Sequence, residues 1–384
     1  MSRKLHKFQT VAEYQAYSAS TDYTTPCVAV VEENNVIYYD YGDNKPQADM
    51  SDFKVESQKT SVGGDKYGNS AITKVNYIPS STTSLASAFE NWSSLEEVTC
   101  KIPNSVTSWD STFNGCSSLV TAPEMPSGVT SLSYTFNGCS SLVNAPVIPS
   151  SVTSLSYTFD GCSSLVNAPE IPSGVTNMSY TFNGCSSLVT APEIPSSVRN
   201  IRYTFYGCSS LVNAPEIPSG VTSLDSTFSG CSSLVNAPVI PNSVTSLDST
   251  FNGCSSLVNA PVIPSGVKSL YHTFDGCSSL VNAPVIPSGV TSLPDTFNGC
   301  SSLVNAPVIL SGVKSLSYTF NGCSSLKEVT FLHTTPPSYN HTLSGCSKLE
   351  SIYVPDKAVD IYKTATRWSE FADKFKPLSS KPSE

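Results

Sequence analysis

The sequence repeats itself with a fixed period of 23 residues. Eleven cysteines keep this period without a gap, and phenylalanine keeps it from Phe113 to Phe320. The cysteines of the series are Cys116, Cys139, Cys162, Cys185, Cys208, Cys231, Cys254, Cys277, Cys300, Cys323 and Cys346. A period of roughly 20 to 30 residues is typical of a solenoid, in which each copy is one rung of a stack. The period therefore constrains the architecture more closely than the function.

The copy at residues 139–161 shows why the rungs have to stack. Its apolar residues are separated by Ser, Thr and Asn, so they can face one interior. They are Leu142, Ala145, Ile148, Val152, Leu155 and Phe159, followed by Cys162. A large apolar side chain stabilises by roughly 2 to 3 kcal/mol when buried, whereas each ordered residue costs about 1.5 kcal/mol. A single rung is therefore unstable, and its neighbours must cover it, with caps at the two ends.

Prolines and glycines predict the shape of a rung. Pro146 and Pro149 lack the amide hydrogen that a ladder needs, which confines a parallel strand to about residues 141–145. Asn137 and Gly138 predict a tight turn, because both tolerate a positive φ. We expect a strand, a turn, a short extended or 3-10 segment and a second turn, with rungs about 4.8 Å apart.

The order of these residues resembles the BspA-like leucine-rich repeat, which also has 23 residues and occurs in surface proteins of gut and oral bacteria. The shared pattern is Leu-x-x-apolar, Ile-Pro, Val-x-Ser-Leu and Phe-x-Gly-Cys, over about residues 75–355. One departure is that the segment from Ala145 to Pro149 is one residue longer than the family's common form. The resemblance implies a right-handed leucine-rich-repeat superhelix with short parallel strands, and a role in adhesion.

The N-terminal part differs from the repeat. Residues 1–45 predict a small α+β module, with a helix over residues 10–19 and a β-hairpin from residues 27–31 and 36–39. This module resembles short N-terminal segments of proteins from gut bacteria and their phages. Residues 46–74 are rich in Gly, Asp, Lys and Ser and predict a linker or an irregular first cap.

The repeat body of about 12 rungs covers residues 75–355, and residues 356–384 predict an α-helical C-terminal cap. Residues 349–355 predict a last strand, and Asp356 is placed to cap the helix that follows. The aromatic and apolar side chains expected to cover the last rung are Val359, Tyr362, Trp368, Phe371 and Phe375.

Composition argues against several classes of partner. Only 13% of the residues are charged, the net charge is −9, and no basic cluster marks a nucleic-acid surface. No apolar run is long enough for membrane insertion. The first seven residues are basic but precede no apolar segment, so we expect no Sec signal peptide. The expected location is extracellular, on a cell surface or on a virion.

The 13 cysteines predict neither disulfides nor a metal site. Equivalent cysteines in stacked rungs are related by a translation of about 4.8 Å, which does not suit a disulfide. No Cys-x-x-Cys pair is present to bind zinc. We therefore expect a buried column of thiols that acts as small apolar filler, and no cofactor.

Repetition also argues against an enzyme, because a residue present in every copy serves every rung. Ser249, His272 and Asp295 occupy one position in three consecutive copies and match the residue types of a catalytic triad. The position is expected to be flat and exposed, and no Gly-x-Ser-x-Gly motif is present. We predict no catalytic residues.

The same position provides the main candidate for binding. Tyrosines recur there, two residues after a buried Leu or its equivalent and two before the buried Phe, and exposed tyrosines can stack on sugars or pack against proteins. The alternative is that they only cover the edges of the rungs. The tyrosines are Tyr134, Tyr157, Tyr180, Tyr203 and Tyr318, and Arg199, Arg202 and Tyr206 in one divergent copy are a second candidate.

Another position changes along the chain from acidic to apolar. It is Glu124, Glu170, Glu193 and Glu216 in some copies, and Val147, Val239, Val262, Val285 and Val308 in others. Exposed valines would form an apolar interface. We favour the alternative, in which they belong to a half-buried β surface.

These features favour a non-enzymatic binding or adhesion protein that recognises a protein or glycan on a cell surface through its repeats. One alternative is a phage or prophage tail-associated receptor-binding protein, which needs no export signal. Another is a structural spacer without a ligand. The sequence leaves the ligand and the oligomeric state open.

Overall fold

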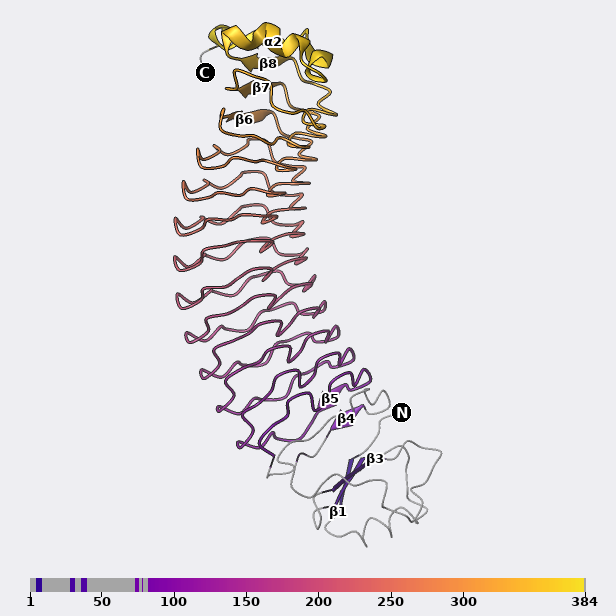
Figure 1. The fold of residues 1–384 in the computed structure, drawn as a ribbon. Coiled ribbons are helices and arrows are strands. Elements are labelled where there is room, and N and C mark those ends of the chain that lie inside the picture. Colours follow the sequence, from indigo (N-terminus) through magenta and orange to yellow (C-terminus); the bar gives the residue numbers. More distant parts are fainter. Residues whose placement is uncertain are drawn as a thin grey trace. The chain divides into compact units, whose positions relative to one another are not determined.

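The computed structural model describes residues 5–8, 28–31, 36–39, 73–75, 78 and 82–382. The chain forms two compact units, residues 1–175 and 176–384. In both units the described repeats wind as rungs of a leucine-rich-repeat solenoid, and the last rungs of the second unit lie beneath helix α2 (Val359–Thr364) (Figure 1).

The densest hydrogen bonding between rungs lies just before each cysteine. The amides of Leu132, Tyr134, Phe136 and Gly138 donate to carbonyl oxygens of the next rung over 2.6–3.2 Å. The alternate amides of the same segment donate to carbonyls within their own rung. This alternation places Tyr134 and Gly138 at φ 58° and 71°, in the left-handed region. Gly138 therefore makes the predicted turn, but the main pairing segment is not the predicted one.

The strand expected over residues 141–145 is much shorter in the structure. Only Asn144 bridges to the neighbouring rungs there, at Thr121 and Asn167. Pro146 has no amide hydrogen to donate to a neighbouring rung, so the pairing ends there. A second series of single bridges, such as Ser131 to Ser154, was not expected.

Continuous ladders form where the proline is missing. Strands β7 (Glu328–Phe331) and β8 (Ser351–Val354) pair in parallel over three consecutive residues. Strand β6 (Asn305–Ile309), which contains the proline, shifts register against β7 between Asn305 and Val308. Strand β9 (Phe375–Pro377) completes the sheet in the order β6-β7-β8-β9.

Two smaller sheets lie nearer the N-terminus. Strands β4 (Lys74–Val75) and β5 (Glu97–Val98) pair in parallel. Strands β2 (Val28–Val31) and β3 (Val36–Tyr39) pair antiparallel, and β1 (Leu5–Phe8) adds in parallel to β2. The helix expected over residues 10–19, and nearly all of the segment 46–74, lie outside the described residues.

The core repeats one set of contacts in every rung. Phenylalanine rings of successive rungs stack with centroids 5.5 Å apart for Phe113 and Phe136. The Thr158 hydroxyl donates to the Leu132 carbonyl of the preceding rung (2.9 Å). The Cys162 thiol donates to the Phe136 carbonyl (3.1 Å). Ten of the eleven thiols in the series are buried, as predicted, Cys346 is half-buried, and the thiols are hydrogen-bond donors as well as filler.

The C-terminal cap is not the single helix that was expected. It comprises η3 (Asp356–Ala358), α2, η4 (Trp368–Phe371), β9 and η5 (Leu378–Ser380). Phe375 lies in strand β9, and Asp356 accepts the amide of Ser379 (3.0 Å) instead of capping a helix. The rings of Tyr362 and Trp368 are buried and meet edge to face at 5.3 Å.

Removing a single buried hydroxyl tests the contacts between rungs. Thr250 Oγ1 donates to the Leu224 carbonyl over 2.9 Å in the core, so Thr250→Val should lower the free energy of unfolding by about 1 kcal/mol. Thr245 is exposed, and its hydroxyl donates to the Thr222 carbonyl over 3.3 Å. Thr245→Val should therefore change the free energy of unfolding by less than about 0.5 kcal/mol. Urea unfolding of both variants measures the difference, and equal effects would refute the role of the buried bond.

The buried thiols predict unfolding in alkali. Burial raises the pKa of Cys231, Cys254 and Cys277 well above the usual range, whereas a thiol in the unfolded chain ionises near about pH 8.5. Their stabilisation is complete below that pH and is lost as the pH rises towards the folded pKa. Over this range each thiol lowers the free energy of unfolding by about 1.4 kcal/mol per pH unit.

Urea unfolding between about pH 8 and pH 10.5 measures this loss. Replacing Cys231, Cys254 and Cys277 by Ala should reduce the slope of the unfolding free energy against pH by about 4 kcal/mol per pH unit. An unchanged slope would show that other groups cause the alkaline unfolding.

Candidate functional site

In each unit, one ridge of the rungs carries residues in the left-handed backbone region, and we call the whole series the tyrosine column. Every member has φ between 50° and 58°. A non-glycine residue in this region costs roughly 1 to 2 kcal/mol, which the amide bonds to the next rung offset. The members are Ser87, Ser111, Tyr134, Tyr157, Tyr180, Tyr203, Ser226, Ser249, His272, Asp295, Tyr318 and His341. Sequence reasoning found the column but not its backbone conformation.

The tyrosines of this column stack on one another. Tyr134 and Tyr157 lie 4.5 Å apart with planes 9° from parallel, and Tyr180 and Tyr203 lie 4.5 Å apart at 5°. Tyr318 stacks on a histidine, His341, at 4.9 Å. Tyr134 is 41% exposed, and the other four tyrosines are half-buried. Ring faces inside each pair are covered, so the column offers mainly ring edges and hydroxyl groups to a partner.

The candidate binding residues of the divergent copy do not all lie together. Arg202 forms an ion pair with Asp225 (3.0 Å), and Tyr206 lies 6.0 Å from Tyr203. Arg199 instead donates to carbonyl oxygens of its own turn and lies over Gly220 of the next rung. Arg202, Tyr203 and Tyr206 are therefore neighbours, whereas Arg199 belongs to another edge.

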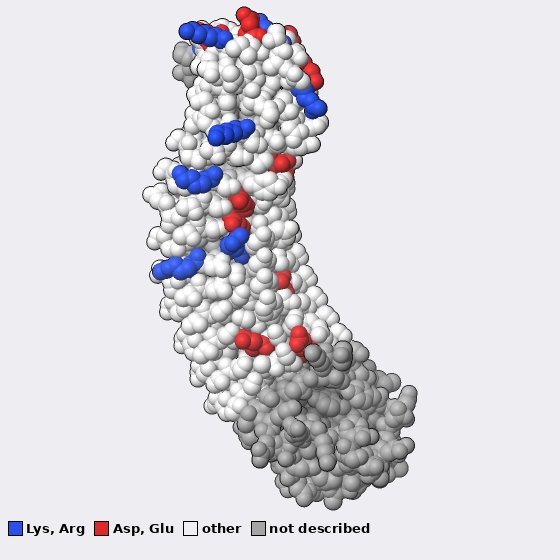
Figure 2. Space-filling view, in the orientation of Figure 1, with Lys and Arg blue, Asp and Glu red and all other residues white. Residues whose placement is uncertain are grey.

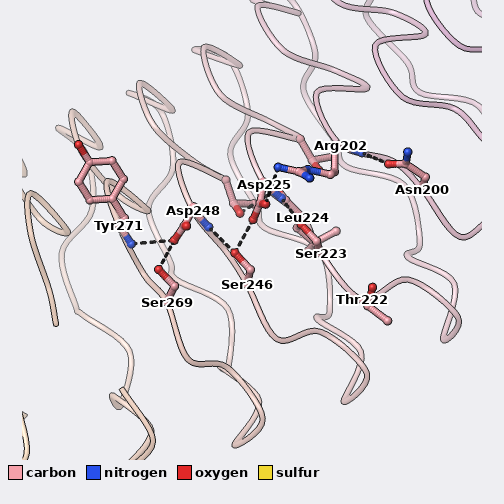
Figure 3. A network of polar contacts seen from close by, with 12 residues as sticks. Asn200, Arg202, Thr222, Ser223, Leu224, Asp225, Ser246, Asp248, Ser269 and Tyr271 are labelled. Atoms are coloured by element: carbon pink, nitrogen blue, oxygen red, sulfur yellow. Dashed lines mark hydrogen bonds and ion pairs between the residues drawn. The ribbon is translucent and has the colours of Figure 1, made fainter. Parts of the chain in front are cut away.

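A polar network connects these rungs, as Figure 3 shows. The Asp225 carboxylate accepts the Ser246 hydroxyl as well as the Arg202 guanidinium. Asp248 in turn accepts the hydroxyl of Ser269 and the amide of Tyr271 (3.1 Å). These carboxylates join adjacent rungs, and sequence reasoning missed them although aspartate follows the buried leucine in both copies.

The residues that resemble a triad do not assemble as one. The Nδ1 atom of His272 lies 2.8 Å from Asp275, and its Nε2 atom lies 3.8 Å from Asp295. Desolvation raises the pKa of Asp295. Because carboxylates face both ring nitrogens, neither nitrogen is directed at Ser249 as a base. Within residues 82–382 and the other described segments, no cluster of His, Cys, Asp or Glu is arranged to hold a metal ion.

Four of the five valines at the second variable position are almost fully exposed, so the expectation of a half-buried surface is wrong for them. Val239, Val262 and Val285 are 85–87% exposed in three consecutive rungs, and Val308 in the next rung is 45% exposed. We call these four residues the valine stripe. In the first unit Val147 is 88% exposed. The extra residue after the asparagine bridge turns these side chains away from the core.

The surface beside Val262 and Val285 is hollowed, and the walls of the hollow carry no charged side chain. An open hollow of about 520 Å³ lies between two rungs, and its walls include Pro261, Val262, Asn282 and Val285. Asn282 also accepts an amide hydrogen bond from Asn305 (2.7 Å). Charged side chains are sparse over the rungs on the face that Figure 2 shows. In the described part of the chain, no helix is long and apolar enough to cross a bilayer.

Comparisons with known proteins agree with this architecture. The model of the BspA type leucine-rich repeat region matches residues 46–166, 132–258, 176–304 and 248–371. No curated protein matches the chain.

Solved structures are also similar to this chain. A leucine-rich repeat protein from Bacteroides ovatus is 26% identical over 83% of this chain and 87% of its own, with a TM-score of 0.60. A leucine rich cell surface protein from Faecalibacterium prausnitzii is 22% identical over 84% and 86%, with a TM-score of 0.46. The family matches together span most of the sequence, and the chain therefore belongs to the BspA-type leucine-rich repeat family.

Proposed function

We propose that this protein is a non-enzymatic adhesion protein that recognises a protein or glycan on a cell surface through its rungs. The observation that supports the proposal best is the valine stripe. Three consecutive valines expose 85–87% of their surface to water, and such a row is typical of an interaction surface.

The stripe is not needed for stacking. Glu193 and Glu216 occupy the same position in the two rungs that precede Val239, and both glutamates are exposed. Their rungs keep the same buried leucine, phenylalanine and cysteine as the valine rungs. A position that accepts either a charge or a valine without a change in the core contributes little to folding, so we infer that its valines serve binding.

The gain from covering the stripe is large enough to matter. Burying a valine side chain stabilises by roughly 1.5 kcal/mol or more, so three valines supply about 4 to 5 kcal/mol. This corresponds to about a thousandfold in affinity. The tyrosine column remains a proposal for a second contact, through its ring edges and hydroxyl groups.

A binding assay tests the stripe. The purified protein is applied to whole gut-bacterial cells, mucin glycans and bacterial polysaccharides, beside a Val262→Ser, Val285→Ser double variant. We expect the double variant to bind at least about tenfold more weakly, because it loses two apolar contacts. The matched control is Val235→Ser with Val258→Ser, which changes valines that are 38–39% exposed at another position.

A variant with Tyr134, Tyr157, Tyr180 and Tyr203 replaced by Ser separates the two surfaces. If binding survives in the valine double variant but fails in a folded tyrosine variant, recognition belongs to the tyrosine column. If the unmodified protein binds none of the targets, the adhesion proposal fails and the chain is a spacer. Circular dichroism checks that each variant is folded.

A further inference from the structure

The position of the valine stripe continues into the C-terminal sheet. Val308 lies opposite Thr330 in strand β7, and Thr330 lies opposite Tyr353 in strand β8. The side chains of Val308 and Thr330 point to the same face of the sheet, because Val329 and Phe331, on either side of Thr330, point into the core. Exposure nevertheless falls from 45% at Val308 to 4% at Thr330 and 5% at Tyr353.

The chain's own last residues cover this part of the position. We call residues 378–382 the C-terminal strap. The Lys381 ammonium lies 3.0 Å from the Glu328 carboxylate, 3.3 Å from the Thr330 hydroxyl and 5.6 Å from the centre of the Tyr353 ring. The strap therefore closes over the outward side chains of strands β7 and β8.

The direction of the strap follows from the order of the strands. It leaves strand β9 at Pro377, and Lys381 reaches strand β7 with strand β8 between them. The Lys381 side chain thus extends from the strap along the stack of rungs, past β8 to β7 and in the direction of Val308. A peptide that continued in this direction would pass over Val308, Val285, Val262 and Val239 in turn.

The strap is a short 3-10 turn with an extended residue on either side. Pro377 at φ −67°, ψ 140° and Lys381 at φ −67°, ψ 125° are close to polyproline II geometry. A single 3-10 turn, η5, separates them. A polyproline II chain has no internal hydrogen bonds, and proline-rich segments lose little entropy on adopting it.

The chemistry of the valine stripe differs from that under the strap in one respect. Glu328 meets the lysine of the strap, whereas the walls of the hollow at Val262 and Val285 carry no charged side chain. Those walls are apolar apart from Ser265 and the amides of Asn259 and Asn282. Such amides can donate to peptide carbonyls and accept from peptide N–H groups. Valine and proline surfaces suit apolar side chains of a partner.

We propose that the valine stripe binds an extended, uncharged peptide of a partner protein, rich in proline and branched aliphatic residues. The peptide lies along the stack of rungs, in line with the C-terminal strap. This inference rests on the proposed adhesive function and chooses a protein partner over a glycan.

Selection from a library of random displayed peptides tests the inference, with the full chain as the target. The negative target is the Val262→Glu, Val285→Glu double variant, which should fold because Glu216 occupies the same position in another rung. The control for added charge is Thr222→Glu with Thr245→Glu, at exposed residues of another edge. We expect uncharged peptides with proline and aliphatic residues that bind the valine variant at least about tenfold more weakly than the control.

The outcomes separate the two proposals. If no peptide depends on the stripe, or if the selected peptides are charged, the peptide inference is wrong. If cells or glycans still bind in a manner that depends on Val262 and Val285, the adhesive function stands and its ligand is a glycan. If nothing binds through the stripe in either experiment, the peptide inference fails, and the adhesive function fails with it only if the unmodified protein binds none of the targets.

Discussion

The structure depends on a backbone hydrogen-bond ladder that is not a β-sheet. In each standard rung, alternate amides before the cysteine point to the next rung and the amides between them close turns within the rung. This arrangement needs two left-handed residues per copy, a glycine and the member of the tyrosine column. Glycine is favoured at the first of these because φ lies near 70°, and at Gly230 a Cβ atom would in addition lie 3.2 Å from the Gly207 backbone. The prolines are tolerated because this ladder, and not the strand face, joins most rungs.

The same ladder explains why Thr and Cys recur in every standard copy. The Leu132 carbonyl accepts the Thr135 amide of its own rung and the Thr158 hydroxyl of the next. The Phe136 carbonyl accepts an amide and the Cys162 thiol in the same way. Each buried carbonyl thus has two donors, one from its own rung and one from its neighbour. A residue without a donor would leave one of these contacts unmade, which is unfavourable for a buried carbonyl group.

Part of this architecture was readable from sequence and part was not. The period, the buried apolar set, the glycine turn and the thiol column follow from residue types that have few alternatives. The position of the ladder could not be predicted from the sequence, because a tyrosine or serine in a left-handed conformation has no sequence signal. The exposure of Val262 and the register shift near Val308 share one cause, the extra residue after the asparagine, whose effect on side-chain direction depends on neighbouring rungs. Strand β9 was missed because Phe375 reads equally well as part of a helix face.

A core that is the same in every rung leaves only the outward positions free to differ, and this freedom is where recognition can be encoded. Glu216 and Val239 stand at one position in adjacent rungs, and their cores are alike. The chain fills the same position itself at Thr330 and Tyr353, where a strap with a lysine meets a glutamate. Covered and uncovered stretches of one position therefore differ in charge and in strand pairing, because β7 and β8 form a continuous ladder and the valine rungs only single bridges. If the surface binds extended chains as proposed, the charge pattern along this position is what selects among them, since the valine and glutamate rungs share the same buried leucine, phenylalanine and cysteine.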